Sequence, residues 1–309
     1  MKKIIGLLII LTTIFLGCRG TTTDDTAYSV DTTTESAQQV GDAMASVDES
    51  GGSTGGAITS NEIKSYEKAF SRISPNENSS QILSTQKKVN LFLPQAQATA
   101  CNTIAFDTCG TTAANTKVRT LSSCTTAGNG TMSGNITLTF AGTGAGTCTI
   151  PANTDSVSRV PNYAISGLRG ATFTVSAPTS GQTLTRTAVS TMSLSNAGIK
   201  RTFTTPKGTK LLDITTATGT PLTINGNART GRTISAGTLV VTNNLTSVTC
   251  TLTPAGIAWT GSCNCPTAGT WSATCSDAST YSVAYSSTCG ETTFTKASVA
   301  TPLTMDRCQ

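Results

Sequence analysis

Cysteine is the residue whose number and spacing carry the most chemistry in this chain of 309 residues. The sequence has eleven cysteines and no histidine. Cys18 stands alone near the N-terminus, and the other ten follow residue 100: Cys101, Cys109, Cys124, Cys148, Cys250, Cys263, Cys265, Cys275, Cys289 and Cys308. An even number of cysteines in an exported chain predicts disulfide bonds, here within a cross-linked body after residue 100. Without histidine or paired C-x-x-C sets, we expect neither a metal site at Cys263-Asn264-Cys265 nor a cofactor.

The connectivity of these ten cysteines stays open at this point, because many pairings are compatible with the spacing. Hairpin geometry favours two of them. Cys265 and Cys275 lie on the two sides of a turn expected at residues 266–269, and Cys101 could reach Cys109 across a short loop. A bridge requires Cα atoms within about 7 Å, which a hairpin would provide.

Catalytic patterns are few and incomplete. Gly51-Gly52-Ser53-Thr54-Gly55 matches the G-x-S-x-G nucleophile elbow, but it lies in linker-like sequence and no histidine base exists. Ser65–Lys68 and Ser84–Lys87 match S-x-x-K without its companion motifs. We therefore assign no catalytic residue and expect no enzyme.

Paired carboxylates leave one enzymatic alternative open. A glycosidase needs two carboxylates across a cleft. Acidic residues of the body that could supply them are Asp107, Asp155, Asp213, Asp277, Glu291 and Asp306. The sequence does not show which of them meet, so a hydrolase without histidine remains the second alternative.

Four aromatic residues near the C-terminal cysteines are candidates for a binding surface. Trp259 and Trp271 flank the region between Cys263 and Cys275, and Tyr281 and Tyr285 follow. Exposed, they would suit a glycan or protein partner, and the chain would be a carbohydrate- or ligand-binding module. The other interpretation is that they anchor the core beside the disulfides.

The N-terminus has the pattern of a bacterial secretion signal. Lys2 and Lys3 precede an apolar run over residues 4–16, and Gly17-Cys18 follows. The run is shorter than the ~20 residues that span a bilayer. It resembles the lipoprotein type of signal, which implies cleavage before Cys18 and a lipid, including palmitate, attached there. Arg19 in place of Asp implies the outer membrane. An ordinary cleaved signal and an uncleaved anchor are the alternatives.

Charge is sparse and unevenly distributed. Charged residues make up 12% of the chain, against a usual ~25%. Residues 19–58 hold seven acidic residues and one basic, whereas residues 95–309 hold thirteen basic and six acidic. Only Lys200, Arg201, Lys207 and Lys210 cluster, with Phe203 as the one aromatic among them. We therefore expect a dispersed, solvated basic surface and no nucleic-acid partner.

Composition divides the chain into four segments. Residues 1–17 form the signal and residues 18–58 a flexible tether rich in Thr, Ser, Asp and Gly. Residues 59–94 hold a linker strand and a helix, expected over residues 60–73 because Ile63, Tyr66, Phe70 and Ile73 fall on one face. We expect that face to pack on the body.

Residues 95–309 predict an all-β body, an antiparallel sandwich or barrel-like fold stabilised by disulfides. Alternating runs separated by Gly, Pro and Asn predict strands at residues 135–140, 172–175, 211–214, 238–241 and 281–285. The glycine-rich residues 142–146 lead into strand-like residues 147–150, so we predict a turn there and no phosphate loop.

A weak internal echo leaves the number of units in the body open. Residues 131–150 resemble residues 233–252 at an offset of 102, and the surroundings of Cys109 resemble those of Cys289. Either the body consists of two similar halves, or a threonine-rich chain repeats itself by chance.

Three segments resemble a group of uncharacterised secreted lipoproteins of Gram-negative bacteria: residues 109–140, 259–266 and 305–308. The similarity covers roughly residues 100–309. It implies location and build and brings no activity with it. We predict a lipid-anchored envelope or surface lipoprotein with a structural or interaction role, whose partners are the membrane, through Cys18, and a protein or glycan.

Overall fold

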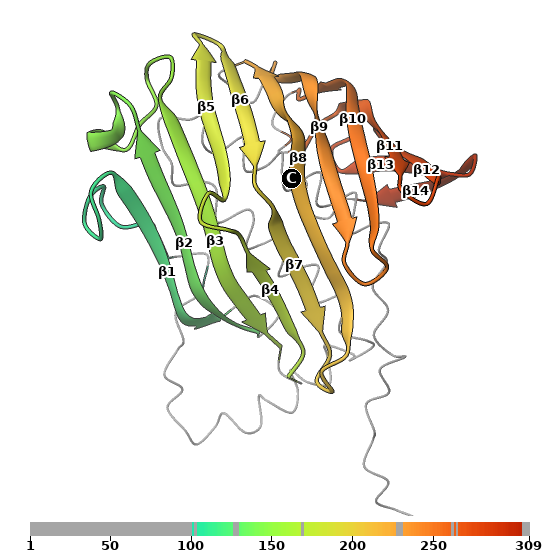
Figure 1. The fold of residues 1–309 in the computed structure, drawn as a ribbon, viewed down its shortest axis with the longest axis horizontal. Helices are drawn as coiled ribbons and strands as arrows, with labels where there is room; N and C mark the ends of the chain where they lie inside the picture. The colour runs from blue at the N-terminus through green and yellow to red at the C-terminus, as the bar shows by residue number, and fades with distance from the viewer. Residues whose placement is uncertain are drawn as a thin grey trace, which may run out of the picture.

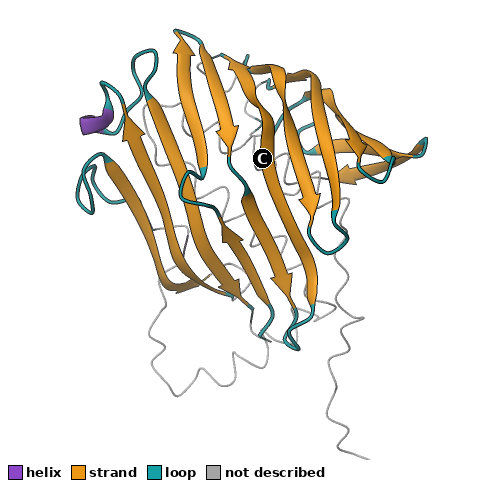
Figure 2. Ribbon diagram, in the orientation of Figure 1, coloured by secondary structure: helices purple, strands orange, loops and turns teal. Residues whose placement is uncertain are grey.

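The computed structural model describes residues 101, 104–125, 130–167, 170–226, 231–260, 263 and 265–304. The expected signal, tether and helix, together with Cys18, Asp306 and Cys308, lie outside these residues. Within them the regular structure is antiparallel β-sheet, with one short 3-10 turn, η3 (Ala145–Thr147) (Figure 2). The prediction of an all-β, disulfide-containing body is confirmed.

Fourteen strands form one continuous sheet (Figure 1). In chain order they are β1 (Thr116–Thr125), β2 (Thr131–Ala141), β3 (Ser156–Ser166), β4 (Thr172–Ser176), β5 (Gln182–Ala188), β6 (Thr191–Asn196), β7 (Ile199–Thr204), β8 (Lys210–Asn225), β9 (Thr233–Asn243), β10 (Val248–Ala258), β11 (Ala268–Cys275), β12 (Thr280–Tyr285), β13 (Glu291–Lys296) and β14 (Val299–Thr304). All five predicted strands are present, in β2, β4, β8, β9 and β12.

The topology is an up-and-down meander in which two strand positions are interrupted. One end of β3 pairs with β5 and the other end with β4, both antiparallel. Likewise β8 pairs with β7 over its first half and with β6 over its last residues. Thus β4 and β5 share one position and β6 and β7 share the next. Fourteen strands occupy the twelve places of the hydrogen-bonded path from β1 to β14.

Local sequence explains the first interruption. Pro161, which has no N–H to donate, lies between the stretches of β3 that pair with β5 and β4. Gly181 has a positive φ of 50°, and a Cβ there would lie 2.1 Å from the carbonyl oxygen of Arg159. Only glycine fits so close to the neighbouring backbone at this point.

The second interruption, between β6 and β7, is stabilised by Asn196. Its Oδ1 accepts a hydrogen bond from the Gly198 N–H at 3.0 Å, and its own N–H donates to Thr218 Oγ1 at 2.9 Å. The side chains of Asn196 and Thr218 therefore accept hydrogen bonds from backbone N–H groups that have no partner strand at the interruption.

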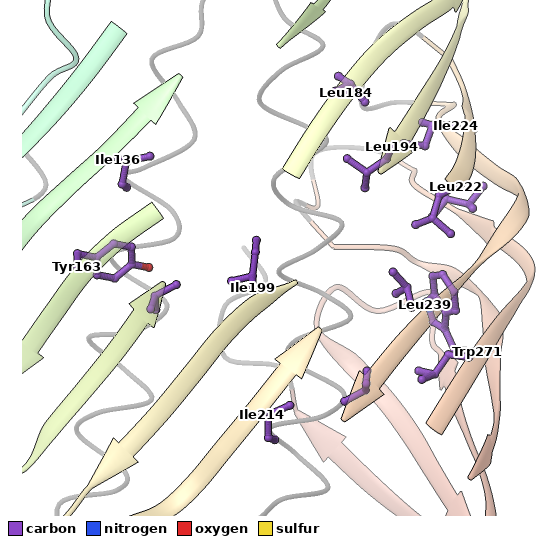
Figure 3. Packing of buried hydrophobic residues seen from close by; sticks show 14 of the residues in the cluster. Ile136, Tyr163, Leu184, Leu194, Ile199, Ile214, Leu222, Ile224, Leu239 and Trp271 are labelled. Carbon is purple, nitrogen blue, oxygen red and sulfur yellow. The ribbon is translucent and has the colours of Figure 1, made fainter. Parts of the chain in front are cut away.

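One face of the sheet is apolar and buried. Side chains alternate between buried and more exposed along most strands, as the two-residue period of a strand requires. The buried side chains that Figure 3 labels come from β2, β3, β5 to β9 and β11. The core thus runs along the sheet from its first strands to its last.

Two disulfides lie within each end of the meander. They are Cys101–Cys124 and Cys109–Cys148 at the first end, and Cys250–Cys275 and Cys263–Cys289 at the other. Cys265 is disulfide-bonded as well. The expected bridges Cys265–Cys275 and Cys101–Cys109 are wrong. Cys275 lies directly opposite Cys250 in the register of β10 and β11, whereas Cys265 precedes β11.

One further expectation is corrected. Thr147–Ile150 is not a strand, because the chain turns through η3 and Cys148 adopts a left-handed conformation with φ of 51°. The aligned Cys250, by contrast, lies within β10. The two segments of the internal echo therefore have different local structures.

Candidate functional site

The four aromatic residues that were candidates for a binding surface belong to the core or pack against it. Trp259 and Trp271 are 1% and 0% exposed, and Tyr285 is also buried. Tyr281 is partly buried and stacks on Phe294, with ring centroids 5.4 Å apart. Burial raises the pKa of Tyr281 to about 12. The interpretation that these residues anchor the core is therefore confirmed for Trp259, Trp271 and Tyr285, and the alternative of an exposed aromatic surface is wrong. Trp271 shares its strand face with the buried Ala273 and Cys275.

Asp155 holds the glycine-rich turn that follows β2. Its Oδ1 accepts hydrogen bonds from the Thr143 N–H at 2.7 Å and Oγ1 at 3.0 Å, and its Oδ2 accepts one from the Ala152 N–H at 2.9 Å. The hydrogen bond from Ala152, with those from Thr143, lowers the pKa of Asp155 below its ordinary value. This carboxylate holds a loop, and its oxygens are occupied by the chain.

Two other carboxylates have the same kind of role. Asp107 accepts hydrogen bonds from the Thr112 hydroxyl and the Val118 N–H, each at 2.6 Å. Asp277 accepts from both the N–H and the hydroxyl of Ser279 in a tight turn. Glu291, in contrast, is exposed at the start of β13. The described acidic residues are thus distributed over separate loops and strands.

Asp213 forms ion pairs with two lysines on the face of the sheet opposite the apolar core. Its carboxylate lies 3.1 Å from both Lys200 Nζ and Lys210 Nζ, and Asn244 Nδ2 donates to it at 2.7 Å. Burial would raise the pKa of Asp213, but hydrogen bonds from Asn244, Lys200 and Lys210 outweigh it, so the pKa lies below its usual range. Arg201 lies on the other face, and the predicted basic cluster is therefore divided between two faces.

The outer face of the sheet is rich in hydroxyl groups. Neighbouring strands bring Ser and Thr side chains opposite one another, and these form hydrogen bonds across the strands. The pairs are Ser158 with Thr183, Thr174 with Thr202, Thr220 with Thr238, and Thr242 with Thr249. Such pairs stabilise neighbouring strands and leave a surface of hydroxyl and methyl groups with few charges.

Four arginines are buried, and three lie within strands of the apolar face. Arg119 in β1, Arg159 in β3 and Arg201 in β7 are opposite the buried Ile136, Leu138 and Ile214. The fourth, Arg232, lies just before β9, two residues from the buried Ile234. Burial lowers the pKa of Arg232 to about 10. Arginine is rarely buried without a charged or hydrogen-bonded partner.

The burial of these arginines was not predicted, although the sequence contains a signal for it. Each arginine of a strand has apolar residues two positions away, such as Leu121 for Arg119, and Ile199 and Phe203 for Arg201. The alternation that identified the strands therefore also placed the guanidinium groups on the apolar face.

No group of three or more His, Cys, Asp or Glu residues in the described ranges is arranged to hold a metal ion. The same residues contain no helix with the length and apolarity needed to cross a bilayer. No family model matches the chain, and neither the curated proteins nor the solved structures give a significant match.

Proposed function

We propose that this protein is a lipoprotein of the bacterial outer membrane, anchored through a lipid on Cys18, with a structural or interaction role in the cell envelope. The observation that carries the proposal is the order Lys2-Lys3, apolar run and Gly17-Cys18. Several acyl chains on one cysteine would hold the body stably at a membrane, whereas one chain binds only marginally.

The cysteines of the body support export. All nine described cysteines are disulfide-bonded. Disulfides form and persist in oxidising compartments such as the periplasm and the cell surface, and are rare in the cytosol. An exported chain with a lipoprotein-type leader is consistent with that chemistry.

The outer face of the sheet is the surface that we expect a partner to contact. Its paired Ser and Thr hydroxyls can donate and accept hydrogen bonds, which suits a glycan or the backbone of a protein. Nucleic acid is not the expected partner, because Lys200 and Lys210 are paired with Asp213 and four arginines are buried.

The anchor is tested by expressing the full chain in a Gram-negative host. Wild-type protein should fractionate with the outer membrane, and its intact mass should correspond to a chain that begins at Cys18 and carries acyl groups. Cys18→Ser should abolish the acyl mass and release the protein from the membrane.

Variant Arg19→Asp is the matched control for the membrane. It leaves Cys18 intact, so the acyl mass should persist, and the resemblance predicts a shift toward the inner membrane. A mature protein with an unmodified Cys18 thiol, or one that begins elsewhere, would contradict the proposal.

A further inference from the structure

A row of polar side chains crosses the outer face of the sheet, with one residue on each of six neighbouring strands. Figure 1 shows these strands side by side in the order β2, β3, β4, β7, β8 and β9. Each residue lies directly opposite the next in register, and each is exposed or half-buried beside a buried residue of its own strand. The members of this polar row are Asn135, Asn162, Ser176, Lys200, Thr215 and Thr242.

The spacing of the polar row is set by the sheet itself. Neighbouring strands lie about 4.8 Å apart, so the six side chains recur at about that interval along roughly 24 Å. Hydroxyl and amide groups both donate and accept hydrogen bonds. A linear glycan has matching groups, because every sugar along the chain carries hydroxyls that donate and accept. The polar row therefore suits a chain of sugars that lies across the strands.

Lys200 is the charged member of the polar row, and a second lysine lies beside it. Lys200 Nζ is 3.1 Å from Asp213 Oδ1, and Lys210 Nζ is 3.1 Å from Asp213 Oδ2. Asp213 is buried, whereas the two lysine side chains are 43% and 50% exposed. Two ammonium groups against one carboxylate leave one positive charge. Each ammonium has three N–H donors, so the two lysines can bind an anion from solvent while they still contact Asp213.

We propose that the polar row binds a linear acidic glycan whose sugars carry carboxylate groups, as uronic acids do. The sugar hydroxyls hydrogen-bond to the Asn, Ser and Thr side chains of the row, and one sugar carboxylate binds the ammonium groups of Lys200 and Lys210. A carboxylate has one negative charge and so matches the one positive charge left at Asp213, whereas a phosphate monoester has about −1.5 to −2 at neutral pH.

This inference rests on the proposed role of the outer face as the surface that contacts a partner. It does not depend on the lipid at Cys18. The Cys18→Ser variant should therefore bind the glycan as the wild type does, so failure of the anchor and failure of glycan binding are separate results.

Isothermal titration calorimetry of the purified full chain with oligomers of galacturonic acid tests the binding. Affinity should rise at least about tenfold from the disaccharide to the hexasaccharide, because the longer chain contacts more of the polar row. A neutral glucose hexasaccharide lacks the carboxylates and should bind at least about threefold more weakly than its acidic counterpart. Equal affinity for the neutral and acidic chains, or affinity that does not depend on length, would overturn the proposal.

Charge variants test the role of the two lysines. Lys200→Gln should weaken binding of the acidic hexasaccharide roughly three- to fivefold, whereas Asp213→Asn, which leaves both lysines and removes the competing carboxylate, should strengthen it by a similar factor. The matched control Lys296→Gln removes an exposed lysine of β13 and should bind as the wild type does. If Asp213→Asn does not fold, Lys210→Gln replaces it and should weaken binding as Lys200→Gln does. Unchanged affinity in Lys200→Gln would overturn the proposal.

Shortening the polar row tests the direction of the glycan. Asn135→Ala/Asn162→Ala should weaken the hexasaccharide at least about threefold and leave the disaccharide unchanged. The control Thr293→Ala/Thr301→Ala changes exposed residues of β13 and β14 and should affect neither. Equal binding of the hexasaccharide by the first variant and the wild type would contradict a glycan that lies across the strands. A hexaglutamate peptide that binds as tightly as the acidic hexasaccharide would show that charge alone is recognised and would also overturn the proposal.

Discussion

At the scale of single residues, Asp155 shows how one carboxylate can fix the conformation of a loop. Its carboxylate accepts hydrogen bonds from Thr143 and Ala152, on the two sides of the segment that carries Cys148. Gly142 packs against it so closely that a Cβ there would lie 2.0 Å from Oδ1. Glycine at 142 and aspartate at 155 therefore depend on each other.

We expect Asp155→Asn to lower the melting temperature by several degrees at neutral pH. The amide has one acceptor oxygen in place of two, so part of the set of hydrogen bonds is lost. Because the pKa of Asp155 is depressed in the folded state, its contribution is complete above the ordinary Asp pKa of about 3.9 and is lost as the pH falls through the folded value.

The measurement is thermal unfolding of wild type and Asp155→Asn by circular dichroism between pH 2 and 7. Their difference should be constant above about pH 5 and should shrink toward pH 2. Asp277→Asn, in an exposed turn with Ser279, should change the melting temperature less. A difference that grows as the pH falls would contradict the role assigned to Asp155.

At the scale of elements, the bridge between β10 and β11 joins residues that are directly opposite in register. Removing it with Cys250→Ala/Cys275→Ala should cost about 3–4 kcal/mol, because it closes a loop of 25 residues in the unfolded chain. Thermal unfolding should show a fall of roughly 10 °C in the melting temperature. Cys263→Ala/Cys289→Ala is the matched comparison, since its separation is 26 residues.

Peptide mapping without reduction checks the connectivity in the same sample. It should recover the four described bridges. It should also join Cys265 to Cys308, because Cys308 is the one remaining cysteine after residue 100. A free thiol at Cys265 would contradict this pairing. Unchanged stability of both double variants would contradict the prediction that each bridge stabilises the fold by restricting the unfolded chain.

Sequence patterns could predict the strands because their signal is local. Alternation at residues 135–140 or 281–285 depends only on which side chains face the core. The pairing of β4 with β7 and of β6 with β8 could not be predicted from the sequence, because the strands that pair lie about 30 residues apart in the chain. The bridges were mispredicted for the same reason. Cys275 bonds to Cys250 because the register of β10 and β11 places them opposite each other, whereas the turn expected at residues 266–269 favoured Cys265 as its partner.

The burial of the candidate site residues is the second feature that the sequence could not predict. The sequence placed Trp259, Trp271 and Tyr285 near the disulfides and left both a core position and a surface position open, because side-chain exposure depends on the whole sheet. The buried arginines were missed because arginine is normally a surface residue. Their spacing relative to Leu121, Ile199 and Phe203 contained the information.

At the scale of the whole molecule, the described bridges are confined to the two ends of the meander. Two lie within residues 101–148 and two within residues 250–289, and none crosses the strands from β3 to β9. Reduction should therefore loosen β1, β2 and β10 to β13 before the centre. Hydrogen exchange of oxidised and reduced protein should show faster exchange at both ends and smaller changes from β3 to β9. Uniform acceleration would contradict this division.

The meander also determines the order in which the chain can fold. Strand pairing runs between neighbours along the path, and no described bridge separates its cysteines by more than 39 residues. Contacts that are close in sequence require little loop closure and form quickly. A chain that is exported one end first, as we propose, can therefore pair each strand with one already present and close each described bridge within a short length of newly exposed polypeptide. The first strands therefore do not stay unpaired, and prone to aggregate, until the last strands are available.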